Sequence, residues 1–140
     1  MENYYRQMQD CLARAEQRVG QERLAATFFA HFFEHFPETM NYFADTDISK
    51  FGPRKYRIIS TFLLDMIRHP DFAEAELTDE VRRHQDYGLK DKDYYFALID
   101  ALQLTVKEAL DDEWTVAMEE CWQDVSMAMK GVIRQAFTFI

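Results

Sequence analysis

His84 is the residue whose neighbours best suit it to chemistry. It begins the run HQDYGL, which ends at Leu89, and Tyr94 follows on an apolar stretch with a helical pattern. A histidine at the end of a helix, followed by a glycine and an apolar residue, can present one imidazole nitrogen to a metal. The alternative is that His84 is only a polar residue that ends an amphipathic helix, the commoner role of a lone histidine.

A second string of potential metal ligands, HFFEH, occupies residues 31–35. It matches the His-x-x-Glu-His pattern of inverted zinc peptidases, in which two histidines bind zinc and the glutamate acts as a base. The chain is far smaller than those peptidases, and the matching helix ends at once at Phe36-Pro37. We therefore expect His31 and His35 to lie at the polar edge of a helix.

Two other classes of site are excluded by residue counts and motifs. An oxygen-carrying di-iron bundle needs several His and carboxylate ligands repeated over four helices, and the chain has only 4 His. It also has no glycine-rich phosphate loop and no nucleophile elbow.

The elements that must position these residues are helices. Apolar residues recur three and four positions apart within 29–36, 59–67 and 95–106, whereas the alternation typical of strands is not sustained anywhere. Glycines and prolines mark the breaks between these segments. The pattern predicts an all-α fold, one domain over residues 1–140, with helices at 3–19, 21–36, 54–69, 78–86, 91–110 and 113–137.

Two helix starts are predicted from local chemistry. Pro53 suits the first turn of a helix better than its interior, so the third helix is expected to begin beside it. Thr78 can cap the fourth helix, because Asp79 and Glu80 would then place negative charge in its first turn.

Composition limits the environment and the partners. The net charge is −9 and the pI about 4.8, which argues against nucleic acid or an anionic membrane as the main partner. No signal-peptide pattern and no apolar run of about 18 residues is present, so we predict a cytoplasmic protein. Cys11 and Cys121 lack metal-ligand spacing and fit a reducing compartment, without a structural disulfide.

Several segments in this order resemble a known family. Residues 28–37 form a Phe-rich helix with a proline stop, Phe43 follows at a corner, and the segment from Glu113 carries Cys121-Trp122. Together with the run at His84, they resemble bacterial globins of the flavohaemoglobin-like, three-over-three type, over nearly the whole chain. The resemblance implies a three-over-three helical fold and a b-type haem whose iron is held by His84.

The same resemblance assigns further residues to the haem pocket. Phe43 would stack on the haem, Leu89 would press on one face, and Tyr94 would lie near the proximal side. Counting forward from Pro53 and matching the apolar stripe to this family places Ile59 over the haem and Lys55 one turn earlier, at the entrance to the pocket. A register shift would put Phe51 at that entrance instead. Lys55 would pair with a haem propionate, donate to a bound gas, bind the iron if neutral, or simply be solvated.

The sequence departs from the family pattern in two places. Phe29 is expected to line the haem pocket, but it stands where a tyrosine commonly donates a hydrogen bond to bound oxygen. We therefore expect weak discrimination for oxygen unless Lys55 or a water supplies the donor. A glutamate late in the last helix, which partners the proximal histidine in these relatives, has no match. Strong electron donation to the iron is therefore in doubt.

The function implied is reversible binding or sensing of a diatomic gas (O2, NO or CO) by a monomer or homodimer, with an electron-transfer or signalling protein as a possible partner. The alternative is a haem-free interaction module that signals through a protein partner, although such modules have lost the histidine that this chain keeps as His84. Enzymatic NO dioxygenation would require an external reductase and ranks below simple binding.

Overall fold

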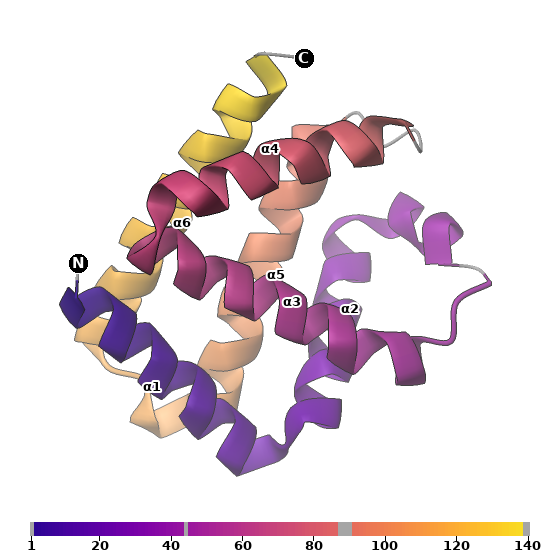
Figure 1. Cartoon of the computed structure of the whole chain (residues 1–140). Helices are drawn as coiled ribbons and strands as arrows, with labels where there is room; N and C mark the ends of the chain where they lie inside the picture. The colour runs from indigo at the N-terminus through magenta and orange to yellow at the C-terminus, as the bar shows by residue number, and fades with distance from the viewer. Residues whose placement is uncertain (1, 44, 87–90, 139–140) are drawn as a thin grey trace.

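Helices make up nearly all of the chain that the computed structural model describes, which is residues 2–43, 45–86 and 91–138 (Figure 1). No strand occurs within these ranges, as the predicted all-α class requires. The elements are, in chain order, α1 (Glu2–Val19), α2 (Gln21–His35), the 3-10 segment η1 (Pro37–Phe43), α3 (Ile48–Arg68), α4 (Pro70–Asp86), α5 (Lys92–Leu110), the 3-10 turn η2 (Asp111–Glu113) and α6 (Val116–Thr138).

The helices form two layers. In Figure 1, α1, α3 and α4 lie nearest the viewer, and α5 and α6 run behind them. Helix α2 completes the second layer beside α5 and also packs against α3 of the first layer. Gly20 separates α1 from α2 with a φ of 86°, a backbone region that glycine enters without strain. This is the three-over-three arrangement that the sequence predicted.

Helix α5 lies at the centre of the core. Its buried residues occur on all sides, from Tyr94 to Leu110, as expected for a helix enclosed by its neighbours. The Phe-rich face of α2 packs against it, with Phe28 and Phe32 fully buried. Large aromatic side chains therefore supply much of the apolar area that stabilises the fold.

The predicted start of the third helix at residue 54 was wrong, because α3 begins at Ile48. Asp47 caps it, since its Oδ1 accepts hydrogen bonds from the backbone N–H of Ser49 at 3.1 Å and from the Ser49 hydroxyl at 2.6 Å. Pro53 consequently lies inside the helix. The carbonyl of the exposed Ser49, four residues earlier, loses its helical partner there, and water can replace it.

We expect the cap at Asp47 to contribute to the stability of the fold. The Asp47→Ala variant should lower the free energy of unfolding by about 1 kcal/mol, because the first turn of α3 loses its side-chain acceptor. Urea unfolding followed by circular dichroism measures this, with Asp45→Ala, at an exposed position of the preceding turn, as the control. An equal effect of both variants would mean that charge, rather than the cap, is responsible.

The fourth helix was also predicted too short. Helix α4 begins at Pro70, a residue suited to the first helical position, instead of at Thr78. Thr78 is inside the helix, where its hydroxyl donates to the carbonyl of Glu74 at 2.9 Å. The first turns were missed because α4 buries only a narrow stripe, Ala73, Leu77 and Val81, within an acidic sequence.

The remaining predicted helices agree with the structure within a few residues. Thr115 caps α6, since its hydroxyl accepts from the N–H of Met118 at 3.1 Å. Cys11 and Cys121 are buried free thiols, and burial raises the pKa of Cys121 to about 11. None of the described helices is both long enough and apolar enough to span a membrane.

Candidate functional site

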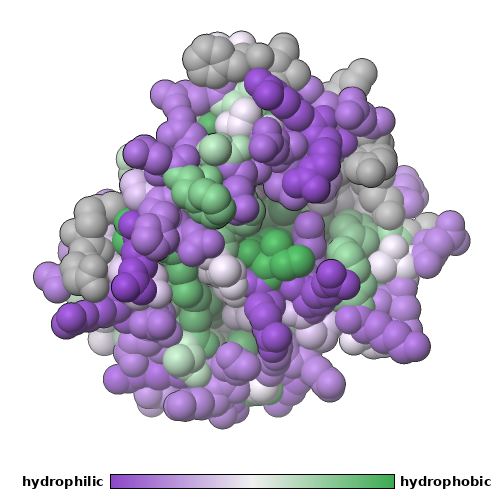
Figure 2. Space-filling view, in the orientation of Figure 1, coloured by the Kyte–Doolittle hydropathy of each residue, from purple (hydrophilic) through white to green (hydrophobic). Residues whose placement is uncertain are grey.

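An apolar cavity lies between the two layers, with walls from α3, α4, α5 and α6. In Figure 2, hydrophobic surface is visible in a hollow near the middle of the front face, with hydrophilic residues around it. The cavity has a volume of about 80 Å³. It is lined by Lys55, Ile58, Ile59, Phe62, Leu77, Glu80, His84, Tyr94, Tyr95, Leu98, Ile99, Met129 and Ile133.

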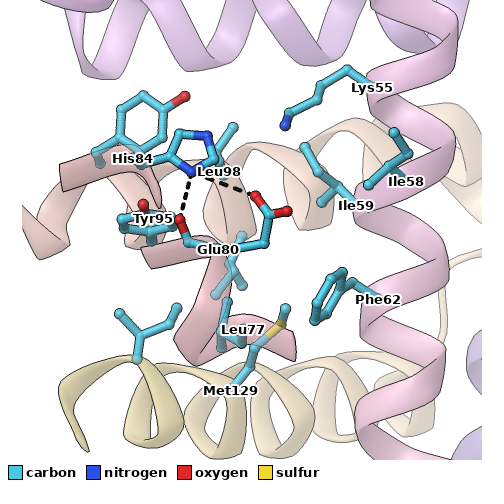
Figure 3. Close-up of a pocket in the computed structure, with 13 residues that line it drawn as sticks. Lys55, Ile58, Ile59, Phe62, Leu77, Glu80, His84, Tyr95, Leu98 and Met129 are labelled. Carbon is cyan, nitrogen blue, oxygen red and sulfur yellow. Dashed lines mark hydrogen bonds and ion pairs between the residues drawn. The ribbon is translucent and has the colours of Figure 1, made fainter. Parts of the chain in front are cut away.

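His84 contributes an imidazole to this cavity from the last turn of α4 (Figure 3). Its Nδ1 lies 2.7 Å from the backbone carbonyl oxygen of Glu80. A carbonyl can only accept, so Nδ1 must carry the hydrogen and, in the neutral ring, Nε2 carries the lone pair. The backbone of α4 thus fixes the tautomer that can bind a metal through Nε2.

Glu80 brings a carboxylate to the same wall. Its Oε2 lies 3.4 Å from Nδ1 of His84, and its Oε1 lies 2.5 Å from Nη2 of Arg83. From the sequence, Glu80 was expected only to place negative charge in the first turn of a helix. The spacing of four residues between Glu80 and His84 is the signal that could have paired them, because such residues lie on one face of a helix.

Lys55 and Ile59 line the opposite wall, one turn apart on α3 (Figure 3). The Lys55 side chain points into the space between α3 and α4. Burial lowers the pKa of its ammonium group, and the Glu80 carboxylate partly opposes that effect. Phe51 was the alternative to Lys55 if the alignment of α3 with the family were shifted. It is not on the cavity wall and packs against Phe43, with ring centroids 5.9 Å apart.

Phe29 and Phe43 lie together, but in an aromatic cluster beside the cavity. Their ring centroids are 5.8 Å apart, and neither residue is on the cavity wall. Phe33 continues this cluster to Phe32, which packs edge-on against Tyr94 at 5.2 Å. Because Tyr94 does line the cavity, the cluster forms a continuous apolar layer with it.

Tyr95 is a cavity residue that the sequence analysis missed. Its ring meets the His84 ring edge-on at 6.1 Å between centroids. Its hydroxyl is buried and has no hydrogen-bond partner among the described residues, and burial raises its pKa. A buried hydroxyl without a partner is costly, so it favours a polar atom of a ligand at this wall. Leu89, expected on one haem face, lies outside the described residues.

The residues present fit a haem in chemical character. The walls are mainly apolar, and one imidazole on them is held through Nδ1 in the tautomer that carries its lone pair on Nε2. The cavity volume is well below the roughly 300–1,000 Å³ of small-molecule pockets. A flat cofactor therefore enters only if α3 and α4 separate or the side chains between them repack.

The zinc-peptidase string does not form a metal site in the part of the chain that is described. Nε2 of His31 lies 2.9 Å from Oε2 of Glu108 on α5, and His35 is exposed at the end of α2. Among the described residues, no three His, Cys, Asp or Glu side chains lie together in a way that could hold a metal ion. The predicted place of both histidines at the helix edge is confirmed.

Comparison with known proteins adds one match. A family model described as Globin matches residues 26–133, from within α2 to within α6, and this range includes every described residue of the cavity wall. A search of curated proteins gave no match.

Proposed function

We propose that this chain, which belongs to the globin family, binds one haem b through His84. We propose also that it reversibly binds a diatomic gas in the same cavity. The observation that carries the proposal is the imidazole of His84 on the cavity wall, with Nδ1 fixed by the Glu80 carbonyl at 2.7 Å. Globins typically bind haem. When haem is bound, its iron supplies a coordination site for the gas.

On the proximal side, the chain's own residues hold and orient the imidazole. The hydrogen bond to Glu80 prevents rotation of the ring, and the edge of Tyr95 packs against it. Leu77 and Leu98 complete an apolar wall that excludes water from the metal ligand. Tyr94, Leu89 and Phe43 remain proposed haem contacts.

On the gas side, Lys55 is the group proposed to contact the gas. Phe29 carries no hydroxyl, and its ring is directed into the aromatic cluster. The Lys55 ammonium can donate a hydrogen bond into the cavity, while Ile59 beside it is apolar. We therefore propose that retention of oxygen depends on Lys55.

The flavohaemoglobin-like, bacterial single-domain subtype is part of the proposal, supported by the spacing of His84 and Tyr94. A non-covalently held haem is supported by the cysteines, because neither is on the cavity wall and the sequence has no Cys-x-x-Cys-His run. NO dioxygenation would need electrons from a separate reductase. The haem-free interaction module is disfavoured by the retained His84 and becomes an outcome of the test.

The test is a titration of the haem-free protein with haem, followed by visible absorption. We expect an intense band that saturates at one haem per chain, and a further spectral shift when the reduced protein is exposed to CO. Failure to form this band would overturn the proposal in favour of the haem-free interaction module. Saturation without a response to CO would retain haem binding and reject gas binding.

A further inference from the structure

We propose that Glu80 is a positioning residue which holds a carboxylate against the proximal imidazole of His84 and so increases the electron donation of that imidazole to haem iron. The inference rests on the proposed ligation of haem by His84. It names a role for Glu80 that neither the family match nor the sequence pattern assigns.

Two oxygen acceptors of Glu80, its backbone carbonyl and its carboxylate, lie near the Nδ1–H of His84. Nδ1 of His84 lies 2.7 Å from the backbone carbonyl of Glu80 and 3.4 Å from its Oε2, as the two dashed lines in Figure 3 show. The carbonyl alone suffices to fix the tautomer. The carboxylate adds a negative charge beside the same hydrogen, which makes the imidazole a stronger donor.

The carboxylate is oriented from its other side. Nη2 of Arg83 lies 2.5 Å from Oε1, which leaves Oε2 turned toward His84. A simple surface ion pair between Arg83 and Glu80 would contribute little to stability. Such a pair does not explain why Glu80 also borders an apolar cavity, where its side chain is only 33% exposed.

The Glu80 carboxylate is also close to Lys55 across the cavity, and the two groups influence each other electrostatically. No ion pair within 4.0 Å joins them in the described structure, whereas Glu80 does reach His84 and Arg83. Glu80 therefore belongs to the proximal side.

This arrangement supplies a carboxylate by a different route from the resembling globins. In those proteins, a glutamate late in the last helix partners the proximal histidine, and this sequence has no match for it. Here the carboxylate comes from α4 itself, four residues before the histidine. The missing glutamate therefore does not imply a weakly donating histidine.

The test compares Glu80→Gln with the wild-type chain, both loaded with haem. A negative charge near the proximal ligand stabilises ferric over ferrous iron, so its removal should raise the reduction potential. We expect about a tenfold change in the ferric-to-ferrous ratio at a fixed potential, which corresponds to about 59 mV for one electron. The iron–imidazole stretching frequency of the reduced protein, measured by resonance Raman, should fall.

Glu76→Gln is the matched control, since Glu76 is exposed one turn earlier on α4 and carries the same charge. It should leave both quantities unchanged. Glu80→Asp keeps the charge but shortens the side chain away from Nδ1, so it should shift the potential in the same direction by less, which keeps the test decisive if Glu80→Gln holds haem poorly. Equal shifts in the Glu80 and Glu76 variants would reject the inference alone, whereas a wild-type chain that binds no haem would reject the proposed function with it.

Discussion

The His84→Ala variant should lose the spectrum of a histidine-ligated haem and bind haem much more weakly than the wild-type chain. Loss of a group that merely orients a metal ligand costs about 10–100-fold in affinity, so loss of the ligand itself should cost more. The fold should survive, because His84 lies on the cavity wall with its side chain 23% exposed, and alanine is a good helix former. Haem titration followed by visible absorption measures the change.

Chemical rescue and a second histidine make this result specific. Free imidazole added to His84→Ala should restore the wild-type spectrum, since alanine leaves space for it beside the cavity. His69→Ala changes an exposed histidine at the end of α3 and should bind haem like the wild-type chain. A wild-type spectrum from His84→Ala without imidazole would show that another residue holds the iron.

The Lys55→Met variant should release oxygen at least about tenfold faster than the wild-type chain. A hydrogen bond from a charged donor contributes about 1.5–3 kcal/mol, and 1.4 kcal/mol corresponds to a factor of ten. Methionine keeps the unbranched stem of lysine, so the packing of α3 against α4 should change little. Stopped-flow displacement of oxygen by CO from the reduced, haem-loaded protein measures the rate.

Lys50→Met is the control, because it removes the same charge from an exposed position of the same helix. It should leave the oxygen rate unchanged. A slow release that Lys55→Met does not alter would reject Lys55 as the donor. Sharply split visible bands in the reduced wild-type protein, lost in Lys55→Met, would instead assign Lys55 to the sixth position on the iron.

Part of the cavity wall could be predicted from the sequence. The family resemblance assigned His84 and Tyr94 to the proximal side of the pocket, and the structure brings both residues to one cavity. Lys55 and Ile59 were placed by the apolar stripe of α3, and both do face the cavity. Glu80 and Tyr95 were missed because a carboxylate on a helix is usually solvated and a tyrosine is usually core.

The sequence by itself determined the all-α class and the breaks between helices at Gly20 and Pro37, because apolar periodicity and helix-breaking residues act locally. Tertiary packing decided where α3 and α4 begin, since Asp47 and Pro70 act as helix starts only when the turns that follow can bury a narrow apolar stripe. It also decided that Lys55 lines the cavity while its neighbour Arg54 is exposed, and that the ring of Phe29 packs against Phe43. Such choices depend on the rotation of each helix relative to its partners, a property that no single segment of sequence contains.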